Sequence, residues 1–383
     1  MKILVVQTIY LGDLVLTLPL VQELKKNFPD ATIEVLANAE AADILRNHPD
    51  VADVICIDKK KTHRGMRGIL ALGKEVQANH YDIALVLPGS VRTAMAIRLA
   101  GVPRRIGTDQ SSGMRLLEDK CKFPGEGRQN FGAKLIYYAE RLWRLLGGKD
   151  SFVSPLFTDV VQLDGSVHAT VRYCALLRPL GASVDEAMGP RLYPAREEAE
   201  CVDRFFAGLP PDAVSVGIAP GSVWPTKRWP AEYFAQLIEQ LPASIGRRPV
   251  RFFLIGSADE SDISQRIVNR VSDKTVIDCC GKLSPLQSAE AIRRCGVLVT
   301  NDAAPLHFAS AVGTPCVAIF GPTDPGFGFG PLTSSSMVVE RSNLWCRPCT
   351  PHGGLRCPIG THECMWGVGL DMVTAAVKTV LGI

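Results

Sequence analysis

The sequence predicts an α/β protein with two doubly wound domains, each a parallel sheet covered by helices on both faces. Short β-branched runs alternate with helix-periodic segments from residue 2 onward, and the same alternation restarts after residue 210. Strands that alternate with helices at this spacing form βαβ units, whose strands are parallel. The length of 383 residues is enough for two domains that each bury a core.

In the first half of the chain, five apolar runs are expected to be strands: residues 2–6, 32–36, 53–57, 82–87 and 104–106. Helices are expected between and after them, at 14–27, 39–46, 90–100 and 130–146. The stretch before residue 210 is less regular. We therefore place the first domain at 1–185 and the second at 186–383.

The second half repeats the pattern. Strands are expected at 214–218, 250–255, 275–277, 297–300 and 316–320. Helices are expected at 231–240, 260–271, 285–294 and 305–312. In open α/β sheets, ligands bind at the carboxyl ends of the strands, so the loops that follow the strands are where chemistry is expected.

Composition excludes several classes of protein. The chain is 46% hydrophobic and 21% charged with a net charge of +3, which is typical of folded proteins and not of disordered ones. The apolar stretch at 14–21 is too short to span a bilayer, and Gly12 and Asp13 interrupt any signal-peptide core. We therefore expect a cytoplasmic protein with reduced cysteines. The small net charge predicts no nucleic-acid partner.

The loop after the first predicted strand carries Gly12 and Asp13. It lacks the G-x-G-x-x-G pattern of dinucleotide-binding proteins, so no nicotinamide, flavin or other organic cofactor is expected. Two interpretations of Asp13 remain open at this point. It is a good helix N-cap residue, and a carboxylate in a cleft between domains can also act as a general base.

Two loops of the second half suit a phosphate ligand. The loop at 219–230 combines the small donors Gly221 and Ser222 with the cation Lys227, although a solvated basic turn anchored by two tryptophans is the alternative. The loop at 300–307 leads into a helix whose first N–H groups favour an anion. His307 is either a ligand contact there or a structural histidine. Together the loops favour a nucleotide diphosphate that is held without a dedicated metal site.

A basic run covers residues 59–64, with Arg67 beyond it. Such a run is commonly a solvated face. Because this one follows a predicted strand, an acidic acceptor molecule is the other interpretation.

Four cysteines lie close together near the C-terminus, at Cys346, Cys349, Cys357 and Cys364. Four thiols within a short Gly/Pro-rich segment fit a structural zinc or iron site. Reduced packing cysteines and a redox pair are the alternatives. A noncatalytic metal or redox module is therefore one hypothesis for the chain as a whole.

Several motifs together resemble the heptosyltransferases of bacterial lipopolysaccharide synthesis, glycosyltransferase family 9. They are LGDLVLTLP at 11–19, PGS at 220–222, PTKRWP at 225–230, ND at 301–302 with His307, and FGPTDP at 320–325. The order and spacing of these motifs make the resemblance specific, and it covers nearly the whole chain.

The resemblance implies a GT-B fold with two Rossmann-like domains facing a central cleft. The N-terminal domain would bind the acceptor; the C-terminal domain would bind the nucleotide-sugar donor and carry the Cys-rich segment at 346–364 and a terminal helix. It also implies inverting transfer of heptose from ADP-heptose to the inner core of lipopolysaccharide. Asp13 would be the general base, and Lys227 with the helix start at 302–307 would hold the diphosphate. A protein or another glycan is the alternative acceptor.

The resemblance also implies binding residues on each side. Donor-binding residues would be Gly221, Ser222, Lys227, Glu260, Leu283, Asp302, Ala303, Ala304 and His307. Residues that bind the anionic lipid A and inner-core acceptor would be Gly12, Lys60, Lys61, Arg64, Arg67 and Arg92. The acceptor would bring the enzyme into peripheral contact with the cytoplasmic face of the inner membrane.

One departure from the family pattern concerns the donor loop. Ala303 and Ala304 stand where the family usually has a hydroxyl residue followed by glycine, so a hydroxyl contact to phosphate is lost. The Cys-rich segment is an addition, and in some relatives such a segment binds iron.

Overall fold

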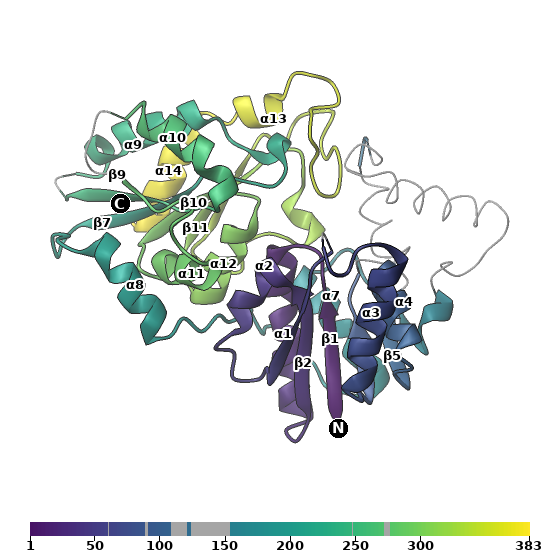
Figure 1. The fold of residues 1–383 in the computed structure, drawn as a ribbon. Helices are drawn as coiled ribbons and strands as arrows, with labels where there is room; N and C mark the ends of the chain where they lie inside the picture. The colour runs from purple at the N-terminus through teal and green to yellow at the C-terminus, as the bar shows by residue number, and fades with distance from the viewer. Residues whose placement is uncertain (60, 89–90, 109–120, 124–153, 247, 272–275) are drawn as a thin grey trace. The chain divides into compact units, whose positions relative to one another are not determined.

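The computed structural model describes residues 1–59, 61–88, 91–108, 121–123, 154–246, 248–271 and 276–383. The chain divides into two compact units (Figure 1). Unit 1 comprises residues 1–117 and 130–190, and unit 2 comprises residues 118–129 and 191–383. Each contains a six-stranded sheet with parallel pairing throughout, so the predicted α/β class with two parallel sheets is confirmed.

The sheet of unit 1 has the strand order β3-β2-β1-β4-β5-β6. Its strands are β1 (Lys2–Gln7), β2 (Thr32–Asn38), β3 (Asp53–Ile57), β4 (Ile83–Val86), β5 (Arg104–Thr108) and β6 (Asp159–Val161). Its helices include α1 (Leu11–Asn27), α2 (Ala39–Ala42), α3 (Gly65–Ala78), α4 (Val91–Leu99) and α7 (Ala169–Cys174). The side chains of residues 3–6 in the central strand β1 are all buried, as expected for a parallel sheet with both faces covered.

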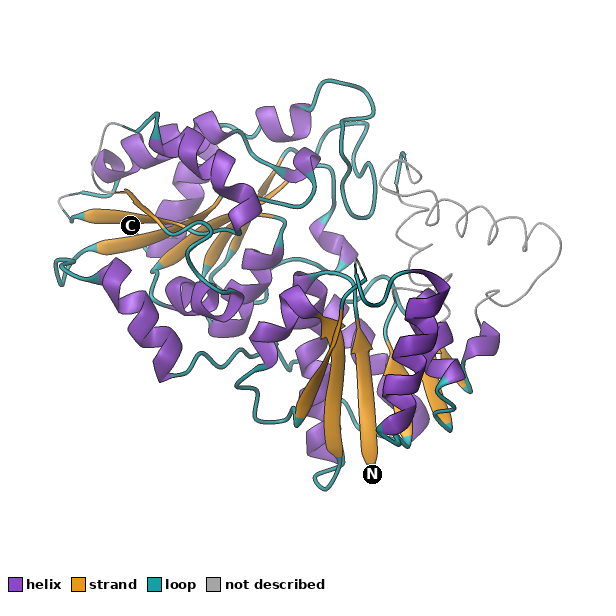
Figure 2. Ribbon diagram, in the orientation of Figure 1, coloured by secondary structure: helices purple, strands orange, loops and turns teal. Residues whose placement is uncertain are grey.

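Helices cover the two faces of this sheet in pairs. The helix α1 packs against α7, and α3 packs against α4 (Figure 2). Ile69 and Leu72 of α3 belong to one buried cluster with Leu4 and Val6 of β1. This packing fixes the loops at the carboxyl ends of β1, β3 and β4 relative to one another.

The sheet of unit 2 has the order β12-β11-β10-β7-β8-β9. Its strands are β7 (Val214–Ala219), β8 (Val250–Leu254), β9 (Val276–Asp278), β10 (Val297–Asn301), β11 (Cys316–Phe320) and β12 (Met337–Glu340). Its helices are α8 (Arg196–Phe206), α9 (Ala231–Ser244), α10 (Ser261–Val268), α11 (Pro285–Arg293), α12 (Ala304–Val312), α13 (Glu363–Trp366) and α14 (Leu370–Leu381). The terminal helix α14 packs against α9 and against β10, β11 and β12.

Both sheets share one topology. Counted within its own unit, each has the strand order 3-2-1-4-5-6 of the Rossmann fold. Its topological switch point lies between β1 and β4 in unit 1 and between β7 and β10 in unit 2. Ligands of open α/β sheets bind at this point, beyond the carboxyl ends of the strands. A ligand is therefore expected at the loops that follow these strands.

Several elements differ from the sequence-based expectation. The helix α3 was not predicted, because its segment contains Gly68 and Gly73, and glycine disfavours helices. Gly68 is required by packing, since a Cβ atom there would lie 2.1 Å from the backbone carbon of His63. The helix predicted at 39–46 ends at Ala42 and continues as a 3-10 turn. The short strands β6 and β12 were missed, and the helix predicted at 130–146 lies outside the described residues.

Among the residues that the structure describes, no helix combines the length and the apolar character needed to cross a membrane.

Candidate functional site

Asp13 lies in the first turn of α1, at the third helical position. The N-cap residue is Tyr10, which makes no side-chain capping hydrogen bond. The interpretation of Asp13 as the N-cap is therefore wrong, because the helix begins earlier than expected. A carboxylate in the first turn is still favoured by the helix dipole.

The Asp13 carboxylate accepts a hydrogen bond from a buried phenol. The hydroxyl of Tyr173, on α7, donates to Asp13 Oδ1 at 3.0 Å. Burial, and next the negative charge of Asp13, raise the pKa of Tyr173 far above its usual value, so the phenol is neutral and acts as the donor. Tyr10 also lies near Asp13, whose charge adds to the effect of burial in raising the pKa of Tyr10.

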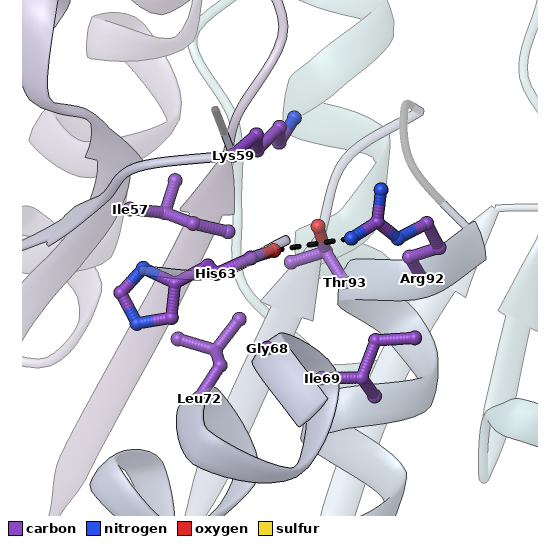
Figure 3. Close-up of a pocket in the computed structure, with 8 residues that line it drawn as sticks. All are labelled: Ile57, Lys59, His63, Gly68, Ile69, Leu72, Arg92 and Thr93. Atoms are coloured by element: carbon purple, nitrogen blue, oxygen red, sulfur yellow. Dashed lines mark hydrogen bonds between the residues drawn. The ribbon is translucent and has the colours of Figure 1, made fainter. Parts of the chain in front are cut away.

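A small pocket in unit 1 is lined by the end of β3 and the loop after it, by α3 and by the start of α4. Lys59 and His63 reach it from the loop after β3, and Arg92 and Thr93 from the start of α4 (Figure 3). Arg92 Nη2 donates to the carbonyl of His63 at 3.0 Å. Lys59 Nζ donates to the carbonyl of Thr8 and to Thr8 Oγ1, the latter at 3.0 Å. The loops after β1, β3 and β4 are thereby joined at the switch point.

The predicted acceptor residues lie around these loops. Arg92 is joined to the β3–α3 loop as described, and Gly12 is buried in the first turn of α1. Lys61, Arg64 and Arg67 are exposed, Arg64 as the N-cap of α3 and Arg67 in its first turn. Lys60 lies outside the described residues.

Lys59 is expected to make the stability of the protein depend on pH. Burial and the nearby Arg92 lower the pKa of Lys59 from its usual 10.5 to about 8. Between these two values the unfolded chain binds more protons than the folded one, so the free energy of unfolding rises with pH in that window. We expect Lys59→Met to remove this rise in urea titrations performed across the window. The exposed Lys61→Met is the matched control, and an unchanged slope in Lys59→Met contradicts the assignment.

In unit 2, Asn301 at the end of β10 holds the loop that follows β7. Its side-chain oxygen accepts a hydrogen bond from the backbone N–H of Trp229 at 3.0 Å, and its amide nitrogen donates to the carbonyl of Pro220 at 2.8 Å. Trp229 is fully buried. The two strands beside the switch point therefore hold this loop in one conformation.

Gly221 and Ser222 lie at the start of the same loop. The Glu260 carboxylate lies so close to Gly221 that a Cβ atom there would come within 1.9 Å of Glu260 Oε1. The other oxygen of Glu260 accepts a hydrogen bond from the backbone N–H of Ser257 at 2.8 Å. Ser222 is buried, and its hydroxyl oxygen accepts from the backbone N–H of Trp224 at 3.3 Å. The structure thus brings together three of the predicted donor residues.

Lys227 and Asp302 form a buried ion pair, with 2.6 Å between Lys227 Nζ and Asp302 Oδ2. Thr323 Oγ1, from the loop after β11, donates to the same carboxylate oxygen at 2.7 Å. Burial pushes the pKa of Asp302 upward, but the charge of Lys227 and these hydrogen bonds outweigh it and hold the pKa below its usual value. His307, which is buried on α12, contributes in the same direction.

The donor-binding role of Asp302 stays a prediction, and the structure adds a contact within the protein. Its carboxylate is ionised and paired with Lys227, and its backbone N–H donates to the carbonyl of Ile319 at 3.2 Å. A carboxylate repels phosphate, and this N–H is already used within the sheet. Asp302 therefore positions the Lys227 ammonium group, a role that the sequence motif alone did not reveal.

The helix α12 begins directly after this ion pair. Its N-cap is Ala303, with no side-chain cap, and Ala304 and Pro305 are its first residues. Pro305 has no N–H, and the N–H of Leu306 donates to the carbonyl of Ala303 at 3.1 Å. An anion at this helix start would therefore be bound by the N–H groups of Ala303 and Ala304. Leu283 is partly exposed and immediately precedes Ser284, the N-cap of α11.

The Cys-rich segment at 346–364 packs directly on the Lys227 loop. Thr226 Oγ1 donates to the carbonyl of Gly354 at 2.9 Å and accepts from its N–H at 2.8 Å. His362 Nε2 donates to the carbonyl of Thr226 at 2.7 Å. Gly353 has a φ of +91°, and a Cβ atom there would lie 3.1 Å from the side chain of Lys227. The sequence analysis did not single out Gly353 and Gly354, although this glycine pair is the feature that could have indicated such a close approach.

The same segment supports the loop after β11. Arg347 Nη2 donates to the carbonyl of Thr323 at 2.8 Å, and the N–H of Cys349 donates to the carbonyl of Pro322 at 2.7 Å. Thr323 in turn holds Asp302. The Cys-rich segment thus braces the Lys227 loop directly and the Asp302 carboxylate through Thr323.

The four thiols of this segment lie near one another. Burial, and next the neighbouring Cys346, Cys364 and Cys357, raise the pKa of Cys349 to about 12. The side chain of Cys349 donates to the carbonyl of Cys346 at 3.1 Å. Within the part of the chain that the structure describes, no three His, Cys, Asp or Glu side chains are arranged to hold a metal ion. The described geometry is therefore not that of a formed metal site.

Known proteins resemble this chain in sequence and in structure. The family model described as "Glycosyltransferase family 9 (heptosyltransferase)" matches residues 69–131 and 147–354. The lipopolysaccharide heptosyltransferase 2 of Escherichia coli K12 is 27% identical over 349 residues, which cover 89% of this chain and 88% of that protein.

Solved structures show the same fold. The E. coli ADP-heptose lipopolysaccharide heptosyltransferase II aligns with a TM-score of 0.72 and 23% identity over 100% of this chain and 98% of that one. The iron-containing dodecameric glycosyltransferase TibC of enterotoxigenic E. coli H10407 aligns with a TM-score of 0.54 and 14% identity over 100% of this chain and 78% of that one. The predicted GT-B fold class is confirmed by these similarities and by the two Rossmann-type sheets.

Proposed function

Since the chain belongs to glycosyltransferase family 9, we propose that this glycosyltransferase transfers a heptose from ADP-heptose to the inner core of lipopolysaccharide, with inversion at the anomeric carbon. The curated relative is named as a lipopolysaccharide heptosyltransferase, and the solved E. coli enzyme is named as an ADP-heptose transferase. A noncatalytic metal or redox module does not fit this family membership.

The donor proposal depends mainly on one observation, the Lys227–Asp302 pair beside the start of α12. An ammonium group beside a helix N-terminus at a switch point is suited to a diphosphate. Lys227 would neutralise the charge that develops on the departing ADP, and Ser222 would contact its oxygens. Glu260, which lies against Gly221, would accept hydrogen bonds from sugar or ribose hydroxyls.

The remaining donor residues complete this proposal. Leu283 would contact the adenine, and the backbone of Ala303 and Ala304 would hold the diphosphate together with His307. Because two alanines replace the hydroxyl found in the family, their contribution would come from N–H groups alone.

In unit 1, we assign the acceptor to the loops after β1, β3 and β4. The acceptor is anionic, and Lys60, Lys61, Arg64, Arg67 and Arg92 provide the cations, with Gly12 beside Asp13. The exposure of Lys61, Arg64 and Arg67 suits a large ligand better than a small one. A lipid-linked acceptor would bring the protein into peripheral contact with the inner membrane at its cytoplasmic face.

The reaction is a single displacement. The acceptor hydroxyl oxygen attacks the anomeric carbon of the heptose, and the bond between that carbon and the phosphate oxygen breaks. The proton of the hydroxyl passes to the Asp13 carboxylate, and ADP leaves with its new charge paired to Lys227. Attack from the side opposite the leaving group inverts the anomeric configuration.

The test is incubation of the purified protein with ADP-heptose and truncated core acceptors, followed by mass spectrometry of the products for the added sugar and NMR for its anomeric configuration. We expect each productive acceptor to gain one heptose, with the anomeric configuration opposite to that of the donor. Transfer to a protein or to another glycan, with none to the core acceptors, would replace the proposed acceptor. Transfer only from a different nucleotide sugar would overturn the donor.

For the Cys-rich segment we propose a structural zinc or iron ion bound by Cys346, Cys349, Cys357 and Cys364. The described side-chain geometry does not form such a site, so binding requires the thiols to rearrange. Sequence spacing and the similarity to an iron-containing glycosyltransferase support the proposal.

Metal analysis of the purified protein tests the structural ion. We expect about one zinc or iron per chain, as for a single four-cysteine site, and a loss of that metal in Cys349→Ser. Cys316→Ser, at a buried cysteine of β11, is the control and keeps the metal. If the wild-type protein, prepared without chelators, contains no metal, the proposed ion is wrong and the thiols are packing residues.

A further inference from the structure

We propose that Tyr173 positions Asp13, by donating a hydrogen bond that holds the carboxylate in one rotamer at the switch point of the first sheet. The inference rests on the general-base role proposed for Asp13. Tyr173 lies 160 positions away in the sequence, and no motif used above includes it.

The contact is a well-formed hydrogen bond. The distance of 3.0 Å between the phenol oxygen and Asp13 Oδ1 is within the normal range. Tyr173 is 6% exposed, so its hydroxyl does not exchange freely among water partners. One carboxylate oxygen is thereby tied to the protein, which restricts rotation about the Asp13 side-chain bonds.

The helix that carries Tyr173 is itself anchored. The neighbouring residue, Arg172, is buried, and its guanidinium donates to the carbonyls of Asp164 at 3.0 Å and Val167 at 2.9 Å. The two helices α7 and α1 pack against each other. Tyr173 therefore donates from a helix that is anchored by Arg172 and packed against α1.

The charges around Asp13 show why a neutral donor matters. Burial lowers the pKa of Arg172, and the negative charge of Asp13 acts on this pKa in the opposite direction. Tyr10 faces Asp13 from the preceding loop, and Tyr173 faces it from α7. A phenol that stays protonated stabilises the ionised carboxylate and orients it through a directed hydrogen bond.

Tyr173→Phe removes the donor and keeps the ring. We expect kcat to fall about tenfold, because the Asp13 carboxylate is then less often oriented toward the proton of the acceptor hydroxyl. The KM for ADP-heptose should stay unchanged. Loss of the donor also destabilises the carboxylate, so the acidic limb of the pH profile of kcat should move upward by about one pH unit. A role limited to stability would leave this limb in place.

A double-mutant cycle with Asp13→Asn isolates the effect. In the Asp13→Asn background, Tyr173→Phe should cause no further loss of activity. An equal tenfold loss in both backgrounds, or an unmoved acidic limb, would overturn the positioning role. Full activity of Asp13→Asn alone would instead disprove the general base, so the two failures are distinguishable.

Tyr81→Phe is the matched control. Tyr81 is another buried tyrosine of unit 1 whose phenol donates to a carboxylate, that of Glu34 on β2. Tyr81→Phe removes a comparable hydrogen bond that does not involve Asp13. The free energy of unfolding should therefore change, while the acidic limb of the pH profile of kcat should not. Should Tyr173→Phe fail to fold, Tyr173→Met provides a second variant with apolar bulk and no donor, and the same shift in the acidic limb is expected.

Discussion

Asp13→Asn is expected to lower kcat by about 1,000-fold, since a positioned general base contributes 10²- to 10⁴-fold to a rate. The amide has nearly the same shape as the carboxylate and can still accept the hydrogen bond of Tyr173. It cannot take the proton of the acceptor hydroxyl. Steady-state kinetics with ADP-heptose and a core acceptor measures the loss, and calorimetry should find donor affinity unchanged because the proposed donor residues belong to unit 2.

The exposed Asp30 offers a control for this substitution. Asp30→Asn makes the same chemical change on the surface of unit 1 and should leave kcat as it is. A turnover rate for Asp13→Asn equal to that of the wild type would exclude Asp13 as the base. A loss of donor affinity equal to the loss of rate would mean that the substitution disturbs the donor site instead.

Lys227→Met is expected to reduce kcat/KM by about 100- to 1,000-fold, the range for loss of one charge-stabilising group in an active site. Lys227 is 9% exposed and pairs with a buried carboxylate. The substitution should therefore also destabilise the fold by about 3–5 kcal/mol, because Asp302 is left as a buried charge without its ammonium partner. Urea unfolding measures this second effect.

The two effects can be separated by a second substitution. Lys227→Met with Asp302→Asn removes both charges, so stability should return while activity stays low. Lys378→Met on α14 is the control for loss of a lysine in the same unit and should retain full activity. If the double variant recovered its activity, the proposed role of Lys227 at the diphosphate would be wrong.

The positions of most strands along the chain were predictable, because the apolar pattern of a buried parallel strand is visible within a short stretch of sequence. Strands buried on both faces are largely apolar runs rich in Val, Ile and Leu, and the central strands β1, β7 and β10 are runs of this kind. The loops after them could therefore be located, and with them Asp13, Lys227 and Asp302. The strands β6 and β12 lie at sheet edges and contain only a few residues, too few for a periodic pattern to be recognised.

Prediction failed where packing overrides local preference. The helix α3 forms although it contains two glycines. At position 68 only a glycine fits against the backbone of His63, so packing requires the residue that helix propensity disfavours. The start of α1 was misjudged for a similar reason. Tyr10 is not a favoured cap residue, so the first turn was assigned to the loop and Asp13 to the cap.

The sequence by itself determined the α/β class, the two sheets and the loops that bear the candidate residues, since these follow from hydrophobic periodicity and turn chemistry along short stretches of chain. Only the tertiary structure decided which distant groups meet there. Tyr173 reaches Asp13 across 160 positions, and Gly354 reaches Thr226 across 128. Such pairs leave no periodic or compositional signal, because they arise from how the finished helices and loops pack.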